Sequence, residues 1–221
     1  MKLAISAITK ALMGLLVFVA LIFFPAGTFV FANGWLLIAI LFVPMIIIGV
    51  ILFVKSPEML EKRLDMKEKE KTQKGVIAIS AIGLVLGFTV AGLDFRFGWS
   101  HISNVAVAIA AAVFLVGYAL YVIVIKQNEY LSRTVKVEKN QRVVDTGLYS
   151  VVRHPMYIAT VLMFLAMPVV LGSLYSLILF CFYPAVIVVR IKNEEELLER
   201  ELAGYKEYKA RVKYRLIPFV W

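Results

Sequence analysis

Long apolar segments separated by short polar stretches dominate the chain. Six of them can be delimited, at about residues 11–31, 35–54, 76–93, 105–125, 156–171 and 174–189. A helix rises about 1.5 Å per residue, so about 20 apolar residues cross a bilayer. The first four segments approach that length. The last two are shorter, and they predict either a hairpin that crosses fully or one that returns within the membrane. The pattern indicates an all-α integral membrane protein with a bundle of five to six transmembrane helices.

Two connections between these segments are expected to be tight turns. Asn33-Gly34 separates the first two segments, and Gly172-Ser173 separates the last two. These residue types favour chain reversal because glycine adopts positive φ freely and asparagine tolerates it.

Composition supports a membrane protein, and the charges predict its orientation. The chain is 62% hydrophobic with a mean hydropathy of +0.86, beyond the roughly 45–50% apolar content of soluble domains. Apart from Arg96, every Lys and Arg lies near the N-terminus or in 55–74, 126–153 and 190–215. Six crossings place all these stretches on one side, so the positive-inside rule predicts that both termini and the active site are cytoplasmic. The net charge of +9 then indicates contact with membrane lipids rather than with nucleic acid.

The polar stretches differ in character. Residues 55–74 alternate acids and bases, which is typical of a solvated helix held by i,i+4 pairs, and we expect no catalytic role there. Residues 126–153 and 190–221 are long and rich in polar and aromatic side chains, so an active site is expected in them. The chain therefore divides into N-terminal spans with a charged loop, 1–104, and a functional core, 105–221.

Two features suggest chemistry at the membrane boundary. His154 and Pro155 stand where the chain enters an apolar helix, and the alternative is a simple interfacial anchor. Arg190 directly follows the apolar run Ala185–Val189, and an ionisable residue at membrane depth is a functional hypothesis by default. No cluster of His, Cys and carboxylate residues has metal-ligand spacing, so no metal site is predicted.

The end of the chain has a helical pattern of its own. Apolar and aromatic residues recur at helical spacing in the tail, at Leu197, Leu198, Leu202, Tyr205 and Tyr208. The pattern predicts a C-terminal amphipathic helix, which either lies in the interface or closes over a cofactor.

The order of motifs in 105–221 resembles the isoprenylcysteine carboxyl methyltransferase family, and in particular its prokaryotic members. The motifs are Asn128-Glu129-Tyr130, Gln141-Arg142-Val143-Val144-x-x-Gly147-x-Tyr149, Arg153-His154-Pro155-x-Tyr157, Arg190-x-x-x-Glu194-Glu195, Gly204-Tyr205-x-x-Tyr208-x-x-x-Val212 and Ile217-Pro218. Each motif is weak alone, and the specificity lies in their order and spacing.

The resemblance implies a membrane enzyme that transfers a methyl group from S-adenosyl-L-methionine to a lipophilic acceptor, such as the carboxylate of a prenylcysteine. By resemblance, the cofactor contacts fall on Gln141, Arg142, Val143, Val144, Tyr149, His154, Pro155, Met156, Tyr157, Glu194 and Glu195. The resemblance also assigns the substrate side of the site, to Arg190 and Asn128.

Elementary chemistry agrees with these roles and leaves alternatives open. A carboxylate is already ionised at pH 7, so its methylation needs alignment and exclusion of water rather than a general base. A guanidinium can hold a carboxylate through two hydrogen bonds. A related enzyme acting on a phospholipid amine or a thiol, an NADPH-dependent enzyme similar to sterol reductases, and a non-enzymatic small transporter remain the alternatives.

Overall fold

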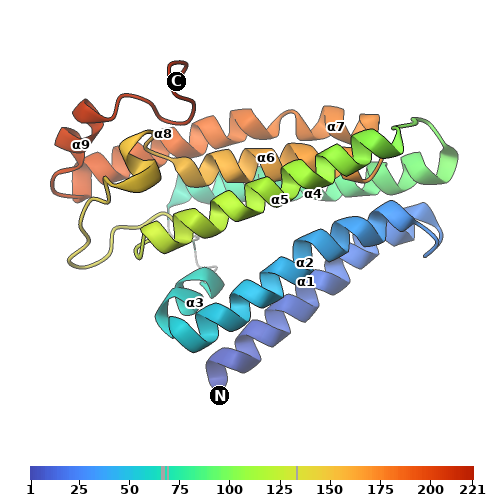
Figure 1. Ribbon diagram of the computed structural model, residues 1–221, viewed down its shortest axis with the longest axis horizontal. Helices are drawn as coiled ribbons and strands as arrows, with labels where there is room; N and C mark the ends of the chain where they lie inside the picture. Colours follow the sequence, from blue (N-terminus) through green and yellow to red (C-terminus); the bar gives the residue numbers. More distant parts are fainter. Residues whose placement is uncertain (66–67, 69, 133) are drawn as a thin grey trace.

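The computed structural model describes residues 1–65, 68, 70–132 and 134–221, and within these residues the chain is helical, without a β-strand (Figure 1). The helices are, in chain order, α1 (Lys2–Ala26), α2 (Ala32–Lys55), α3 (Pro57–Leu64), α4 (Lys71–Phe97), α5 (Asn104–Gln127), the 3-10 helix η1 (Gly147–Ser150), α6 (Pro155–Val170), α7 (Leu174–Phe180), α8 (Tyr183–Glu201) and α9 (Tyr205–Arg211).

Five helical stretches are long and apolar enough to cross a membrane. They are α1, α2, α4 from Thr72 onward, α5, and the nearly continuous pair α7 and α8. Helix α6 is also apolar but has only 16 residues. These helices confirm the predicted all-α membrane bundle.

The hairpin of α6 with α7 and α8 runs the whole length of the bundle (Figure 1). Its turn meets the end of α4, where the Ser173 hydroxyl donates to the buried Asp94 carboxylate, and the loop that follows α4. The Leu174 N–H donates to the Ser100 hydroxyl oxygen at 3.0 Å in the same place. Because the α4–α5 loop marks one end of the bundle, the last hairpin extends from one end to the other rather than returning halfway.

The turn between α1 and α2 lies earlier than the sequence indicated. Gly27 ends α1 with a φ of 70°, and the chain reverses before α2 begins at Ala32. The prediction that Asn33-Gly34 forms this turn was therefore wrong, because both residues lie in the first turn of α2. A side chain at Gly34 would come within 3.0 Å of the Phe23 ring, so this glycine serves close packing of α2 on α1.

Small residues let the other helices pack closely as well. A Cβ atom at Gly87 of α4 would lie 2.3 Å from the Phe180 ring of α7. Phe88 and Phe114 are fully buried at the centre of the bundle. Most other large apolar side chains on the spans face outward, as expected for helices surrounded by lipid.

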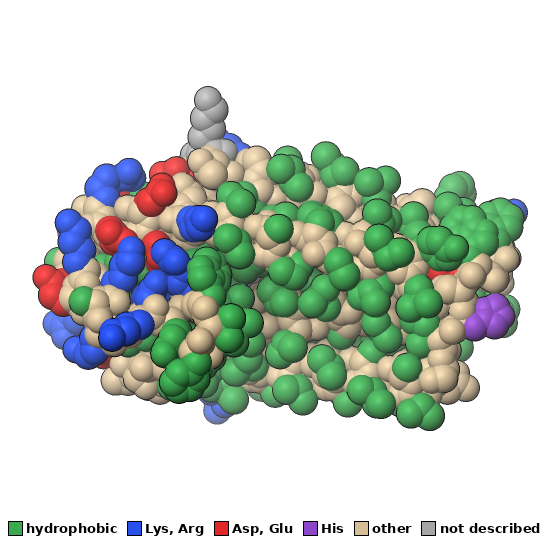
Figure 2. Space-filling model, turned by 90° about the horizontal axis from the view of Figure 1, so that it is seen from above, with side chains coloured by type: hydrophobic (Ala, Val, Ile, Leu, Met, Phe, Trp, Pro, Cys, Tyr) green, Lys and Arg blue, Asp and Glu red, His purple; other side chains and the backbone are tan. Residues whose placement is uncertain are grey.

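Charged side chains gather at one end of the molecule, and apolar side chains coat much of the rest of this face (Figure 2). Helices α3 and α9 lie at the charged end, on the left of Figure 1. The expected C-terminal amphipathic helix is divided here: α8 ends at Glu201, Gly204 adopts a φ of 82°, and α9 begins at Tyr205. This break turns the buried faces of Tyr205 and Tyr208 back toward the bundle.

Candidate active site

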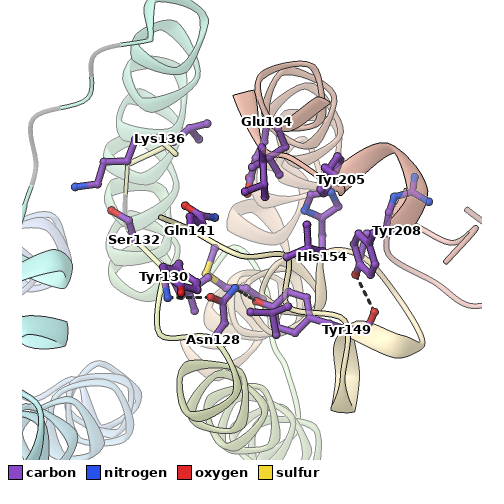
Figure 3. A pocket seen from close by; sticks show the side chains of 18 of the residues that line it. Asn128, Tyr130, Ser132, Lys136, Gln141, Tyr149, His154, Glu194, Tyr205 and Tyr208 are labelled. Atoms are coloured by element: carbon purple, nitrogen blue, oxygen red, sulfur yellow. Dashed lines mark hydrogen bonds between the residues drawn. The ribbon is translucent and has the colours of Figure 1, made fainter. Parts of the chain in front are cut away.

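A pocket with a cavity volume of about 100 Å³, drawn from close by in Figure 3, opens at the charged end. Three stretches far apart in sequence build it: the loop after α5, the entrance to α6, and the end of α8 with α9. Its lining residues are Asn128, Tyr130, Leu131, Ser132, Thr134, Val135, Lys136, Gln141, Arg142, Val143, Val144, Tyr149, Arg153, His154, Met156, Tyr157, Arg190, Glu194, Leu198, Leu202, Tyr205 and Tyr208.

Helix α8 presents one straight stripe to this pocket. Arg190, Glu194 and Leu198 follow one another at four-residue intervals, and Leu202 continues the series directly after the helix. Residues four apart share a helix face, and twelve residues rise about 18 Å. The stripe therefore runs from a cation and a carboxylate near the apolar spans to an apolar surface at the charged end of the molecule.

Tyr157 connects the two charged members of the stripe. Its hydroxyl donates to the Glu194 carboxylate and accepts a hydrogen bond from Arg190 Nε at 2.8 Å. Tyr157 lies in the first turn of α6, where Pro155 occupies the first helical position and needs no N–H partner. The sequence Arg153-His154-Pro155 thus starts α6 at the depth that brings its tyrosine to α8.

Glu195 lies behind the pocket wall and holds its parts together. Its side chain is buried, and one carboxylate oxygen lies 2.7 Å from Arg153 Nε and 3.2 Å from His154 Nε2. The other oxygen accepts from Arg215 Nε at 2.9 Å. Lys209 Nζ lies 3.9 Å from the same oxygen, and three cations and a histidine around one buried carboxylate favour its ionised form. Glu195 and Pro155 stand outside the pocket lining, whereas His154 belongs to it.

The last residues of the chain pack against the start of α6. The backbone N–H groups of Arg153 and His154 donate to the carbonyls of Tyr214 and Arg215, both at 2.9 Å. Arg153 Nη1 donates to the Val212 carbonyl at 2.5 Å. The C-terminal segment is thereby part of the frame that positions His154.

Tyr149 forms the opposite wall. Its hydroxyl accepts a hydrogen bond from Asn128 Nδ2 at 3.0 Å, and its carbonyl accepts one from the Tyr208 hydroxyl at 2.8 Å. Burial raises the pKa of Tyr149 to about 12, so the phenol stays neutral at physiological pH. Gly147, with a φ of 59°, lets the chain turn tightly past Gln127 just before Tyr149.

The loop 130–144 closes a third side. The Gln141 side-chain oxygen accepts from the Glu138 N–H at 2.8 Å, so this amide stabilises the loop's own turn. Arg142, Val143 and Val144 follow along the pocket wall.

One polar atom in the pocket has no protein partner. The Tyr205 hydroxyl is buried, and no hydrogen-bond partner for it lies among the residues described. Burial first, and then the nearby Glu195 and Glu194 carboxylates, raise the pKa of Tyr205, so it keeps its proton. An unsatisfied buried hydroxyl costs roughly 1–3 kcal/mol. Its position on the pocket wall indicates a polar ligand group there.

The structure brings together most of the residues that the sequence singled out. Asn128, Arg190 and all the expected cofactor contacts except Pro155 and Glu195 line the pocket. The wall also contains residues that were not among these expected contacts: Tyr130, Leu131, Ser132, Thr134, Val135, Lys136, Arg153, and Leu198, Leu202, Tyr205 and Tyr208 of the predicted C-terminal helix. The helical spacing of the last four was visible, but the return of α9 over the pocket depends on the break at Gly204.

Comparison of the sequence with known proteins identifies a family for the region that contains most of the pocket. Residues 106–200 match the sequence profile of the isoprenylcysteine carboxyl methyltransferase (ICMT) family. This region belongs to the ICMT family. It contains nearly all of α5 and α8, with the pocket loop, α6 and α7 between them, so the ICMT profile spans most of the pocket wall.

A second similarity is partial. The chain is 30% identical over 91 residues to the Delta(14)-sterol reductase TM7SF2 of Mus musculus. The match includes 40% of this chain and only 22% of the reductase. The ICMT match of the pocket region supports a membrane methyltransferase. The reductase activity is that of a much longer protein, and this chain spans only a small part of its length.

Proposed function

We propose that this protein is an S-adenosyl-L-methionine-dependent methyltransferase that acts in the membrane on a lipophilic acceptor carboxylate, such as that of a prenylcysteine. The observation that carries the proposal is the stripe on α8, within a region of ICMT-family sequence. It places Arg190 at the membrane end, Glu194 next to it and an apolar surface beyond.

The residues of the pocket fit the cofactor. Val143, Leu198 and Leu202 form an apolar surface that suits an adenine ring, and the orphaned Tyr205 hydroxyl offers a hydrogen bond beside it. Glu194, at the other end, suits the positively charged part of the cofactor. The complete proposed set is Gln141, Arg142, Val143, Val144, Tyr149, His154, Met156, Tyr157 and Glu194 as lining residues, with Pro155 and Glu195 behind them.

The acceptor side follows from Arg190 and Asn128. S-adenosyl-L-methionine supplies an electrophilic methyl group when bound. The Arg190 guanidinium orients an acceptor carboxylate, and the Tyr157 hydroxyl fixes Arg190 through its hydrogen bond to Nε. No protein group has to remove a proton, since the carboxylate is already ionised. The buried walls limit access of water, which would otherwise compete for the guanidinium.

The membrane explains the placement of the site. The pocket opens at the charged end, where a soluble cofactor has access, and Arg190 lies toward the apolar spans, where a lipid-linked acceptor resides. With basic stretches at this end, we place both termini and the site on the cytoplasmic side.

The test is calorimetric titration of S-adenosylhomocysteine into the full chain in neutral detergent. We expect saturable binding to the wild type, and losses of about tenfold or more for Glu194→Gln and about fivefold for Tyr205→Phe, since each removes a ligand hydrogen bond. The matched control is Glu196→Gln on the exposed face of the same helix. A well-folded wild type that does not bind S-adenosylhomocysteine contradicts the proposal.

A second candidate comes from the partial similarity to a sterol reductase. In that case NADPH should bind instead. The same titration with NADPH separates the two, and we expect no saturable NADPH binding.

A further inference from the structure

Helix α3 brings the N-terminal half of the chain against the pocket loop. Lys62 Nζ lies 2.8 Å from the Glu138 carboxylate and donates to the Glu129 carbonyl at 3.1 Å. These contacts fix α3 beside the loop after α5, on the charged end of the bundle (Figure 1). Helix α3 lies outside residues 106–200, so the ICMT match does not account for it.

The next residue, Arg63, is a partly buried cation, and no counter-charge pairs with it in the described part of the chain. Its Nε and Nη2 atoms are buried and have no hydrogen-bond partner in the described part of the chain. The guanidinium lies over the Tyr121 ring of α5, with Cζ 5.2 Å from the ring centroid. A ring face stabilises a cation but satisfies none of its in-plane N–H groups.

Burial of these two N–H groups is unfavourable unless a ligand accepts hydrogen bonds from them. An arginine cannot lose its proton in a protein, so it cannot avoid the cost by neutralisation. A buried polar group without a partner loses its interactions with water, and the loss is larger for a charged group. Two adjacent unpartnered N–H groups on a planar fork match the two oxygens of a carboxylate or phosphate.

The position of Arg63 relates it to the pocket. Tyr121 precedes Asn128 by two helical turns on α5, and the Arg63 charge acts on Tyr149, where it opposes the rise in pKa caused by burial. Arg63 itself is absent from the pocket lining. A ligand held by Arg63 would therefore lie next to the substrate side of the pocket rather than on the reacting atoms.

The membrane defines which oxyanions can reach this place. Helix α3 directly follows the span α2, beginning two residues after the end of α2 at Lys55. Its buried Met59 and Leu60 pack it onto the bundle, so it lies at the level where the spans leave the bilayer. Ligands at that level carry an apolar chain and a charged head.

We propose that Arg63 binds the oxyanion of a chain-bearing ligand, a carboxylate or a phosphate, at the membrane interface beside the pocket. If the ligand is the methyl acceptor, the inference rests on the proposed function. The binding of an anion by Arg63 does not depend on that function. Arg63 is then a binding residue that the N-terminal half contributes from outside the pocket lining.

The experiment compares charged and neutral ligands on the full chain. The first probe is N-acetyl-S-farnesylcysteine, with its methyl ester as the neutral match, titrated in neutral detergent. The second is phosphatidylglycerol in nanodiscs, with phosphatidylcholine as the reference. The variants are Arg63→Gln and Arg63→Lys. The matched control is Arg96→Gln, which removes another guanidinium over a ring, that of Phe97 at 5.6 Å, from the end of α4.

We expect Arg63→Gln to weaken binding of at least one anionic probe about tenfold or more. Arg63→Lys should give a partial loss, and Arg96→Gln none. Binding of the methyl ester and of S-adenosylhomocysteine should be unchanged. If the carboxylate probe is the affected one and is methylated, KM should rise while kcat stays the same. An effect on phosphatidylglycerol alone identifies a lipid headgroup as the source of the oxyanion.

Two controls keep the outcomes separable. Arg63→Gln should unfold at the same temperature as the wild type or higher, because it removes a guanidinium with two buried N–H groups that lack a partner in the described part of the chain. If neither anionic probe depends on Arg63, the guanidinium is solvated by water alone and the inference is overturned. A wild type that binds an anion through Arg63 but never binds S-adenosylhomocysteine refutes the proposed function and leaves the anion site standing.

Discussion

Replacing Glu195 by glutamine tests the idea that this residue holds the pocket from behind. The substitution keeps the size of the side chain and removes its charge. In the wild type the buried carboxylate accepts hydrogen bonds from Arg153 and Arg215 and contacts His154. Glutamine offers one acceptor oxygen in place of two, and its amide group faces a cation.

The magnitude follows from the burial of the partners. The Arg153 side chain is only 3% exposed, so its guanidinium would remain in the interior without a counter-charge. Removing one partner of a buried pair costs about 3–5 kcal/mol, and the remaining acceptor keeps the loss near the lower figure. For a chain of this size, about 3 kcal/mol corresponds to a fall of roughly 6–12 °C in unfolding temperature.

The effect on the pocket is separate from the effect on stability. Arg153 and His154 line the pocket, and their backbone positions depend on the C-terminal segment that Arg215 anchors through Glu195. We therefore expect Glu195→Gln to weaken S-adenosylhomocysteine binding by about tenfold even at temperatures where the protein is folded.

The assay is apparent unfolding temperature at a fixed scan rate in detergent, together with titration of S-adenosylhomocysteine. Trp221 lies against Arg215, with the guanidinium carbon 5.2 Å from its ring centroid, so its fluorescence reports locally on the network. The exposed Glu196→Gln is the matched control. A Glu195→Gln variant with wild-type unfolding temperature and wild-type affinity would refute the reasoning.

Three further predictions concern glycine and tyrosine positions. Gly147→Ala should lower S-adenosylhomocysteine affinity about fivefold and the free energy of unfolding by about 1–2 kcal/mol. The cause is a Cβ atom that would lie 2.5 Å from the Gln127 amide on a left-handed backbone. Calorimetry measures the affinity, and thermal unfolding measures the stability. Gly87→Val should lower the unfolding temperature by several degrees through a clash with α7, whereas Gly49→Val, with nothing within 4 Å, should not. Burial in the folded state raises the pKa of Tyr149 from 10.0 to about 12. The neutral phenol therefore contributes stability that is complete below pH 10 and is lost as pH rises through about 12. Between pH 9 and 12, the unfolding temperature should fall less steeply for Tyr149→Phe than for the wild type.

The sequence predicted the spans well because their pattern is local. An apolar run of about 20 residues has few alternatives in a membrane protein. The turn at Gly27 was missed because Asn33-Gly34 is the stronger turn signal, and only the packing of Gly34 against Phe23 shows why a glycine is needed inside α2. The full extent of the last hairpin likewise depends on a contact across the bundle, that of Ser173 with Asp94.

The site was predictable to the extent that motif order identifies a family. Arg190, Glu194 and Tyr157 came from motifs, and the structure adds that one hydroxyl joins the two charged groups. The position of Glu195 could not be foreseen. The adjacent side chains of Glu194 and Glu195 point about 100° apart on the helix. Only the packing of the C-terminal segment against α6 and α8 determines which of the two is buried.

The N-terminal half carries no motif, yet it fixes the position of Arg190, the residue proposed to hold the acceptor carboxylate. Gln73 at the start of α4 is fully buried, and its amide nitrogen donates to the Arg190 carbonyl at 3.2 Å and to Asn193 Oδ1 at 2.6 Å. A hydrogen bond to a helical carbonyl holds that turn of α8 at a defined depth relative to α4. Helix α3, which carries Arg63, precedes α4 in the chain, so both Arg63 and the contact to Arg190 come from the N-terminal half. The N-terminal spans thus act on the site through geometry that no motif in their own sequence records.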